Sequence, residues 1–342
     1  MNSRKTTNIL LLIIVIPIVF YILQVLSFIF IPLFFAMFIS LLFLPLMRKL
    51  NKIKIPKFLS LLLIAIILLF IIKLSGDIIQ LSSKEILNSN GDLLQKIEIK
   101  ANKLFLPIEK FFNIERVEDS SLFLHYFQKM DITKNFAFTF DFIRNTTSMF
   151  LTTIFFVFLL LAESLNMQKI MNLTIIRQKF SSIKVFLRIE KDLLKFMRVK
   201  FIISLFTGLG FTMLCYVFGI SFPLFWGLLA FIINFIQMVG SIISVVFLSA
   251  FAFIELNTTG TLVFFISSII LVQVIMGGIL EPVFLGKSFS INVIAILLMI
   301  MFWGFIWGIP GMILSIPITV LIKIIAEQFI STKLISKLLS NN

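Results

Sequence analysis

Long apolar runs recur along the whole chain, and they constrain its fold more than any other feature of the sequence. Runs of about 18 residues or more are long enough to cross a bilayer as helices. Of the 342 residues, 60% are hydrophobic, and the mean hydropathy is +1.12. Because lipid offers no hydrogen bonds, each crossing segment must satisfy its own backbone groups as a helix. The sequence therefore predicts an all-α polytopic membrane protein whose first partner is the lipid bilayer.

The spacing of these runs predicts about eight transmembrane segments, with broken or re-entrant helices in the C-terminal half. The runs 223–256 and 291–327 are too long for one upright helix at about 1.5 Å per residue. Gly240 interrupts the first run, and Pro310 and Gly311 interrupt the second. Each is either a tilted span or a re-entrant hairpin. The other segments cover about 9–28, 30–47, 58–76, 143–166, 201–221 and 260–277.

Changes in composition divide the chain into five regions. Region 77–142 carries ten acidic and eight basic residues, with Leu and Phe at helical spacing. This pattern predicts an extracytoplasmic insert of amphipathic helices. The other regions are N-terminal membrane segments 1–76, a transmembrane segment with a basic cytoplasmic linker 143–200, a transport core 201–330 and a cytoplasmic tail 331–342.

The net charge of +14 is concentrated in short loops. Cytoplasmic loops of membrane proteins are rich in Lys and Arg, so both termini are predicted to be cytoplasmic, in a bacterial inner membrane. This placement explains the charge without a nucleic-acid partner, and it favours binding of anionic lipid. The clustered basic residues are Arg48, Lys49, Lys52, Lys54 and Lys57, then Lys169, Arg177, Lys179, Lys184, Arg188, Lys191, Lys195, Arg198 and Lys200.

A broken, charged stretch after the seventh segment is the first candidate for a transport site. It places Gly277–Gly278, Glu281 and Pro282 within apolar sequence. A charge at mid-membrane costs about 3 kcal/mol on insertion scales, and Pro282 disfavours helix at the residue before it. We expect the chain to break here, with helix ends that bind a polar substrate or ion and Glu281 as the ionisable group. Alternatively, Glu281 caps a helix or pairs with Lys287 at the interface.

A second candidate lies in the run Asn234–Ser241. Asn234, Gln237 and the Gly240 break stand within apolar sequence. Amide side chains here either bind substrate hydroxyl or carbonyl groups, or join helices by hydrogen bonds and close packing. Gln273 is a further polar contact to the same substrate.

Enzyme motifs are missing from the sequence. His125 is the only histidine and Cys215 the only cysteine, and no phosphate-binding Walker loop is present. A zinc-protease helix with two histidines is therefore excluded. We predict no enzyme activity, no cofactor and no metal site.

The long C-terminal motif resembles that of the autoinducer-2 exporter family of PerM-like bacterial permeases. The resemblance rests on Gly278–Ser288, Leu297–Thr319 and Asn234–Ser241. It implies about eight membrane segments with an extracytoplasmic helical insert, a homo-oligomer, and export of autoinducer-2 or, in some members, sodium–proton exchange. The family's motif residues fall here on Asn234, Gly240, Glu281, Pro282, Gly286 and Lys287.

Three positions depart from the pattern of many members. Gln237 stands where many carry proline, and Met276-Gly277-Gly278 where many carry Glu-Gly-Asn. Asn292-Val293 replaces His-Pro. The departures remove an acid and a histidine that a proton-coupling scheme for the family could use.

Together these patterns predict a secondary transporter that exports a small polar organic molecule by alternating access, coupled to a proton or sodium gradient. The alternatives are a sodium–proton antiporter or ion channel, and a non-transporting scaffold that binds a partner through region 77–142. The predicted pathway residues are Asn234, Gln237, Gly240, Ser241, Gln273, Gly277, Gly278, Glu281, Pro282, Gly286 and Lys287. The predicted hinge and packing residues are Gly304, Gly308, Pro310, Gly311 and Pro317.

Overall fold

The computed structural model describes residues 3–88, 96, 99–100, 148–163, 181–236, 238–286 and 292–328. Within these ranges every regular element is a helix. Gln237, Lys287, the tail 331–342 and most of the predicted insert lie outside them, so the predictions made there remain predictions.

The N-terminal helices pack against one another through apolar side chains. Helix α1 covers Ser3–Val25, α2 covers Ser27–Lys52 and α3 covers Lys57–Asn88, and a further helix covers Ser148–Glu163. Helix α3 continues well beyond its predicted end at residue 76. Helices α2, α3 and Ser148–Glu163 share a buried cluster of Ala36, Met47, Ile64, Val157 and Leu161.

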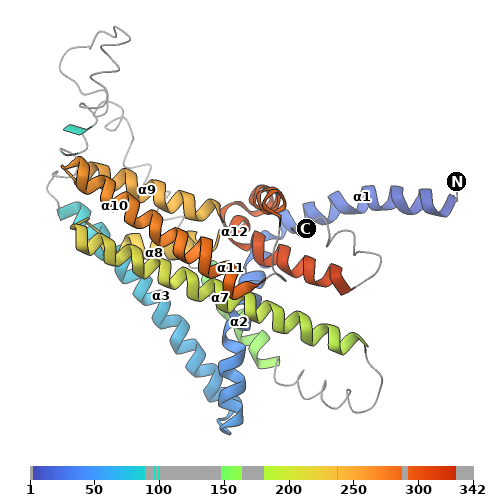
Figure 1. The fold of residues 1–342 in the computed structure, drawn as a ribbon. Helices are drawn as coiled ribbons and strands as arrows, with labels where there is room; N and C mark the ends of the chain where they lie inside the picture. Colours follow the sequence, from blue (N-terminus) through green and yellow to red (C-terminus); the bar gives the residue numbers. More distant parts are fainter. Residues whose placement is uncertain are drawn as a thin grey trace.

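Helix α7, Ser181–Phe218, is the scaffold of the described bundle. Its 38 residues extend about 57 Å, and it contacts α2, α8, α10, α11 and α12. The helix runs without interruption through residue 200, where we placed the boundary between linker and transport core. Figure 1 shows α7 lying along α8 and α10.

The run 223–256 forms a helical hairpin. Helix α8 covers Pro223–Ile233 and α9 covers Val239–Glu255. Trp226 near the start of α8 contacts Phe251 near the end of α9, with ring centroids 5.0 Å apart, so the two helices are antiparallel. The hairpin resolves the choice between a single span and a hairpin for this run.

The expected break at Glu281–Pro282 was wrong. Helix α10, Thr259–Gln273, passes into a π-helical turn, η1, over Val274–Leu280 and then into α11, Glu281–Leu285. In an α-helix a proline ring clashes with the carbonyl four residues back. Here the Glu281 N–H bonds to the Met276 carbonyl five residues back, and we attribute the helix's continuation through Pro282 to this wider turn. The chain leaves the helix only at Gly286, whose φ is 76°.

Helix α12, Val293–Gln328, is divided by a kink at Gly308, where φ is 64° and ψ is −143°. The two arms run in different directions (Figure 1). A Cβ on Gly311 would lie 2.0 Å from the Trp303 carbonyl oxygen, and one on Gly304 would lie 2.9 Å from the Met312 methyl carbon. Both glycines therefore permit close packing. Pro310 and Pro317 lie in the arm after the kink, and hinge motion at these residues remains a prediction.

Aromatic side chains hold α1 and α2 against α12. The Phe20 ring meets Phe302 edge-on at 4.8 Å between centroids, and Trp307 donates its indole N–H to the Leu23 carbonyl at 2.9 Å. Phe34 of α2 also contacts Trp307. The rest of α1 extends away from the other helices (Figure 1).

Five of the described helical stretches are long and apolar enough to cross a membrane, and four shorter apolar helices accompany them. The all-α polytopic class, with interrupted helices in the C-terminal half, is therefore confirmed. The five long stretches are Ser27–Lys52, Lys57–Ser82, Glu190–Phe218, Thr259–Leu285 and Val293–Ala326.

Candidate functional site

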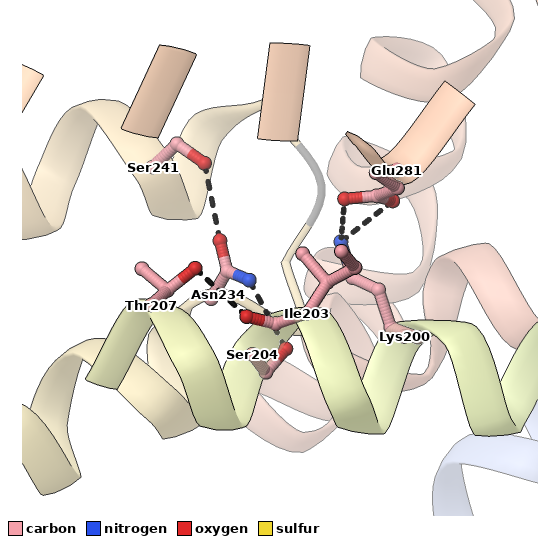
Figure 2. Close-up of polar contacts among 7 residues, drawn as sticks. All are labelled: Lys200, Ile203, Ser204, Thr207, Asn234, Ser241 and Glu281. Atoms are coloured by element: carbon pink, nitrogen blue, oxygen red, sulfur yellow. Dashed lines mark hydrogen bonds and ion pairs between the residues drawn. The ribbon is translucent and has the colours of Figure 1, made fainter. Parts of the chain in front are cut away.

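A buried ion pair joins α7 to α11. Lys200 Nζ lies 3.0 Å from Oε1 and 3.1 Å from Oε2 of Glu281. The two side chains are only 3% and 6% exposed, and Figure 2 shows the ammonium group seated between the carboxylate oxygens. Removing two charges from water costs several kcal/mol per ion, which attraction offsets only in good geometry. A pair of this kind is weak evidence for stability, so its presence among membrane helices favours a functional role.

The sequence reasoning missed Lys200 as the partner of Glu281. It assigned Lys200 to a basic cytoplasmic linker and considered only Lys287 as a partner. The signal that could have revealed it is helical spacing, because Lys200, Ser204 and Thr207 stand four and three residues apart, on one face of α7. All three side chains are buried.

A network of hydroxyl and amide groups continues from this face of α7 into the hairpin break. Asn234 is 1% exposed, and its Nδ2 donates to Ser204 Oγ at 3.0 Å. Ser241 Oγ donates to Asn234 Oδ1 at 3.3 Å. Asn234 therefore bridges α7 and the start of α9 (Figure 2). This contact is consistent with both hypotheses for the segment, substrate binding and helix packing. The Asn234 amide joins helices, while Ser241 keeps oxygen lone pairs for a ligand.

Gln273 carries an acceptor that no described protein group satisfies. Its Nε2 donates to Ser244 Oγ at 3.1 Å, and Ser244 uses its own proton on the Ser241 carbonyl at 3.0 Å. Ser244 can therefore only accept from Gln273, which fixes the amide orientation. Gln273 Oε1 is buried without a hydrogen-bond partner among the described residues. An unpaired buried acceptor costs about 1–3 kcal/mol, so a ligand donor is the natural partner.

One cavity of about 580 Å³ is bordered by Lys200, Glu281, Ser241 and Gln273. Its volume is typical of small-molecule sites. Five of the predicted pathway residues line it, and Lys200 and apolar side chains from α9 and α10 complete the wall. The lining residues are Lys200, Met238, Ser241, Ile242, Val245, Val246, Ile270, Gln273, Val274, Gly277, Gly278 and Glu281.

Glycines of the π-helical turn leave room in this cavity. A Cβ on Gly277 would lie 3.9 Å from both Gln273 Oε1 and Ser241 Oγ. The free amide oxygen and the Ser241 hydroxyl thus face the space that the missing side chain leaves. π-helical turns are rare and occur often at functional sites.

Four other predicted pathway residues do not line this cavity. Asn234 lies one hydrogen bond behind Ser241, and Gly240 packs on the Ile233 carbonyl. Pro282 is exposed on α11. Gly286 ends α11, and there Lys195 Nζ donates to the Leu285 carbonyl at 2.8 Å. The contacts of Asn234 and Gly240 hold the α8–α9 hairpin beside the cavity.

The C-terminal motif and nearly the whole chain match a known family. The model of the AI-2E family transporter matches residues 10–331. This chain belongs to the AI-2E transporter family. The family resemblance inferred from the C-terminal motif is confirmed, and membership agrees with the apolar helices of a bacterial multi-pass membrane protein.

Three relatives illustrate the range of similarity within the AI-2E family. The "Putative transport protein" of Borreliella burgdorferi is 34% identical over 144 residues, 41% of this chain and 39% of that protein. The AI-2 transport protein TqsA of Escherichia coli K12 is 32% identical over 143 residues, 42% of this chain and 41% of that protein. The "Putative transport protein" of Haemophilus influenzae is 23% identical over 309 residues, 87% and 86% of the two chains. The first two matches thus cover about two fifths of each relative's length.

Proposed function

We propose that this AI-2E family member is a gradient-driven secondary transporter of the bacterial inner membrane, which exports a small polar organic molecule resembling autoinducer-2. The observation that carries the proposal is the cavity that holds both the Lys200–Glu281 pair and the unpaired Gln273 oxygen. An ionisable pair supplies coupling to an ion gradient, and an unpaired acceptor supplies a substrate contact. Discontinuous helices of this kind form the substrate sites of many secondary transporters.

Glu281 is the coupling group in this mechanism. With Glu281 ionised, its attraction for Lys200 holds α11 against α7. A proton on Glu281, or a sodium ion beside it, weakens this attraction and frees α11 to move relative to α7. The α8–α9 hairpin then closes or opens the cavity to one side of the membrane. The two states differ in the charge contacts they make, which is what a coupled conformational change requires.

The cavity wall suits a small hydroxylated molecule. Gln273 Oε1 and the lone pairs of Ser241 Oγ accept hydrogen bonds, so they bind hydroxyl groups. Ile242, Val245 and Ile270 offer apolar contact to the carbon skeleton. The relative TqsA is named an AI-2 transport protein, so autoinducer-2 is the first substrate to test.

The test is flux in proteoliposomes, comparing the wild type with Glu281→Gln. Glutamine keeps the shape and can still accept a hydrogen bond from Lys200, but it cannot carry the proton or the charge. We expect efflux of labelled autoinducer-2 to fall to background, while size-exclusion profiles show folded protein. Glu255→Gln is the matched control, because Glu255 accepts from the Ser221 N–H at 2.7 Å outside the cavity. It should transport normally.

A second assay follows internal pH under an imposed sodium gradient. Sodium-dependent proton movement without organic flux identifies an antiporter instead. Normal efflux by Glu281→Gln removes Glu281 from the mechanism. If the wild type shows neither flux, this substrate and ion exchange are both excluded, which leaves an unknown substrate or the scaffold hypothesis.

Replacing Gln273 by leucine tests the substrate contact separately. The loss of one hydrogen bond of about 1–1.5 kcal/mol should raise KM about tenfold. Stability should change little, because the desolvation penalty of the orphan oxygen leaves with the amide. Gln80→Leu on the exposed face of α3 is the matched control and should leave KM unchanged. An unchanged KM in Gln273→Leu means that Oε1 does not touch the substrate.

A further inference from the structure

A second cavity of about 520 Å³ lies between the end of α2 and the N-terminal half of α7. It is separate from the Lys200–Glu281 cavity, and the two share no lining residue. Its lining is strongly basic: Arg48, Glu190, Lys191, Leu194, Lys195, Arg198 and Val199.

The charges in this basic cleft do not balance. Among the described residues that line it, the cations Arg48, Lys191 and Arg198 meet one carboxylate, that of Glu190, which is already engaged with Arg48. Lys191, Lys195 and Arg198 stand four and three residues apart, on one face of α7, where like charges repel. Arg48 Nε is buried and has no hydrogen-bond partner among the described residues. Within the part of the chain that the structure describes, the cleft therefore has a surplus of positive charge and one donor without an acceptor, so an anion is the ligand that suits it.

The position of the cleft indicates where that anion comes from. Arg48 lies near the end of the membrane-crossing stretch Ser27–Lys52, and Glu190 begins the stretch Glu190–Phe218. The basic cleft thus lies at the ends of two stretches that are long and apolar enough to cross a membrane, and the ends of such stretches meet the lipid headgroups. Leu194 and Val199 add an apolar wall beside the cations, which suits the glycerol and upper acyl region of a lipid.

We propose that the basic cleft binds the phosphate headgroup of an anionic phospholipid. Arg48 and Arg198 present guanidinium groups that match phosphate oxygens in pairs, and Lys191 adds a point charge. Basic pockets between membrane helices are known to bind anionic headgroups. This site is distinct from general attraction of the basic loops to the surface, because it depends on which cations line the cleft.

Lys195 connects the basic cleft to α11, the helix that begins at Glu281. Its ammonium group lines the cleft and donates to the Leu285 carbonyl, which ends α11, four residues after Glu281. A bound phosphate shares this ammonium group with that helix end. The lipid is therefore placed to act on the element that carries Glu281.

The test is lipid binding to the purified full chain, measured by native mass spectrometry with dioleoylphosphatidylglycerol and with dioleoylphosphatidylcholine. The variant Lys191→Gln/Arg198→Gln removes two exposed cations that line the cleft. The control Lys49→Gln/Lys52→Gln removes two exposed cations at the end of α2 that do not line it. Both variants lose the same net charge. We expect phosphatidylglycerol affinity to fall at least about tenfold in the first and to change little in the second.

Equal losses in the two variants overturn the proposal, because they show diffuse surface attraction. Equal retention of phosphatidylcholine and phosphatidylglycerol by the wild type also overturns it. Inorganic phosphate, titrated alone, distinguishes a soluble anion from a lipid. If millimolar phosphate displaces the lipid completely, the cleft is a soluble-anion site and the lipid assignment fails.

Discussion

Replacing Lys200 by methionine is expected to abolish transport and to lower the free energy of unfolding by about 3–5 kcal/mol. Methionine resembles the lysine stem in length and packs without a charge. Its partner Glu281 is buried, and its carboxylate loses both contacts, at 3.0 and 3.1 Å. A buried carboxylate without a counterion keeps its desolvation penalty and loses the attraction that offset it.

The double variant Lys200→Met/Glu281→Gln tests whether the loss belongs to the pair. Because it leaves no unpaired charge, we expect it to recover most of the stability lost in Lys200→Met, but not the transport. Unfolding in denaturant can be followed by the fluorescence of the three tryptophans. A control, Lys73→Met, removes an exposed lysine from the apolar helix α3 and should not destabilise the protein. Additive losses in the double variant contradict an energetic coupling between the two residues.

The sequence was sufficient to locate Glu281, because a carboxylate within a long apolar run is costly and must be accounted for. Its partner could not be located in the same way. Lys200 is 81 residues away and continues a basic stretch, so it looks like a loop residue. Only the continuation of α7 through residue 200 and the packing of α7 on α11 place its ammonium group inside the bundle.

The same limit applies to the smaller polar groups. Asn234, Ser241 and Gln273 stood out as polar residues near a break, and all three take part in the network around the cavity. Their partners Ser204 and Ser244 did not stand out, because serine hydroxyls commonly bond to the preceding helical turn in apolar helices. Tertiary packing decides which serines also take part in a hydrogen bond between helices, as Ser244 does with Gln273.

The positions of the helix breaks were predictable only to within a few residues. The first run was predicted to divide at Gly240, but the break precedes it: Met238, with φ 61°, comes before α9, and Gly240 is the second residue of that helix. The second run was predicted to divide at Pro310 and Gly311, but the kink lies at Gly308. The break at Pro282 was predicted wrongly, because the sequence rule for proline assumes α-helical geometry. The π-helical turn η1 changes that geometry, and its formation depends on the neighbours that hold α10 and α11 in line.

Replacing Gly240 by alanine is expected to disrupt the α8–α9 hairpin and to lower the free energy of unfolding by about 3 kcal/mol, the upper part of the range for overpacking. A Cβ at this position would lie 1.9 Å from the carbonyl oxygen of Ile233 and 2.8 Å from its carbonyl carbon. Both are backbone atoms at the end of α8, so the clash cannot be relieved by a change of rotamer. The hairpin must open, which displaces the neighbouring Ser241 from Asn234 and from the cavity wall. Transport should therefore fall together with stability.

Gly260→Ala is the matched control for this variant, because both glycines are the second residue of their helix. Nothing lies within 4 Å of a Cβ built on Gly260. Alanine there reduces the freedom of the unfolded chain and favours the helix, so we expect a change between zero and a gain of about 1 kcal/mol. Denaturant unfolding and autoinducer-2 efflux of the two variants provide the comparison. Unfolding curves that coincide contradict the close approach of Gly240 to Ile233, and with it the hairpin geometry that places Asn234 and Ser241 beside the cavity.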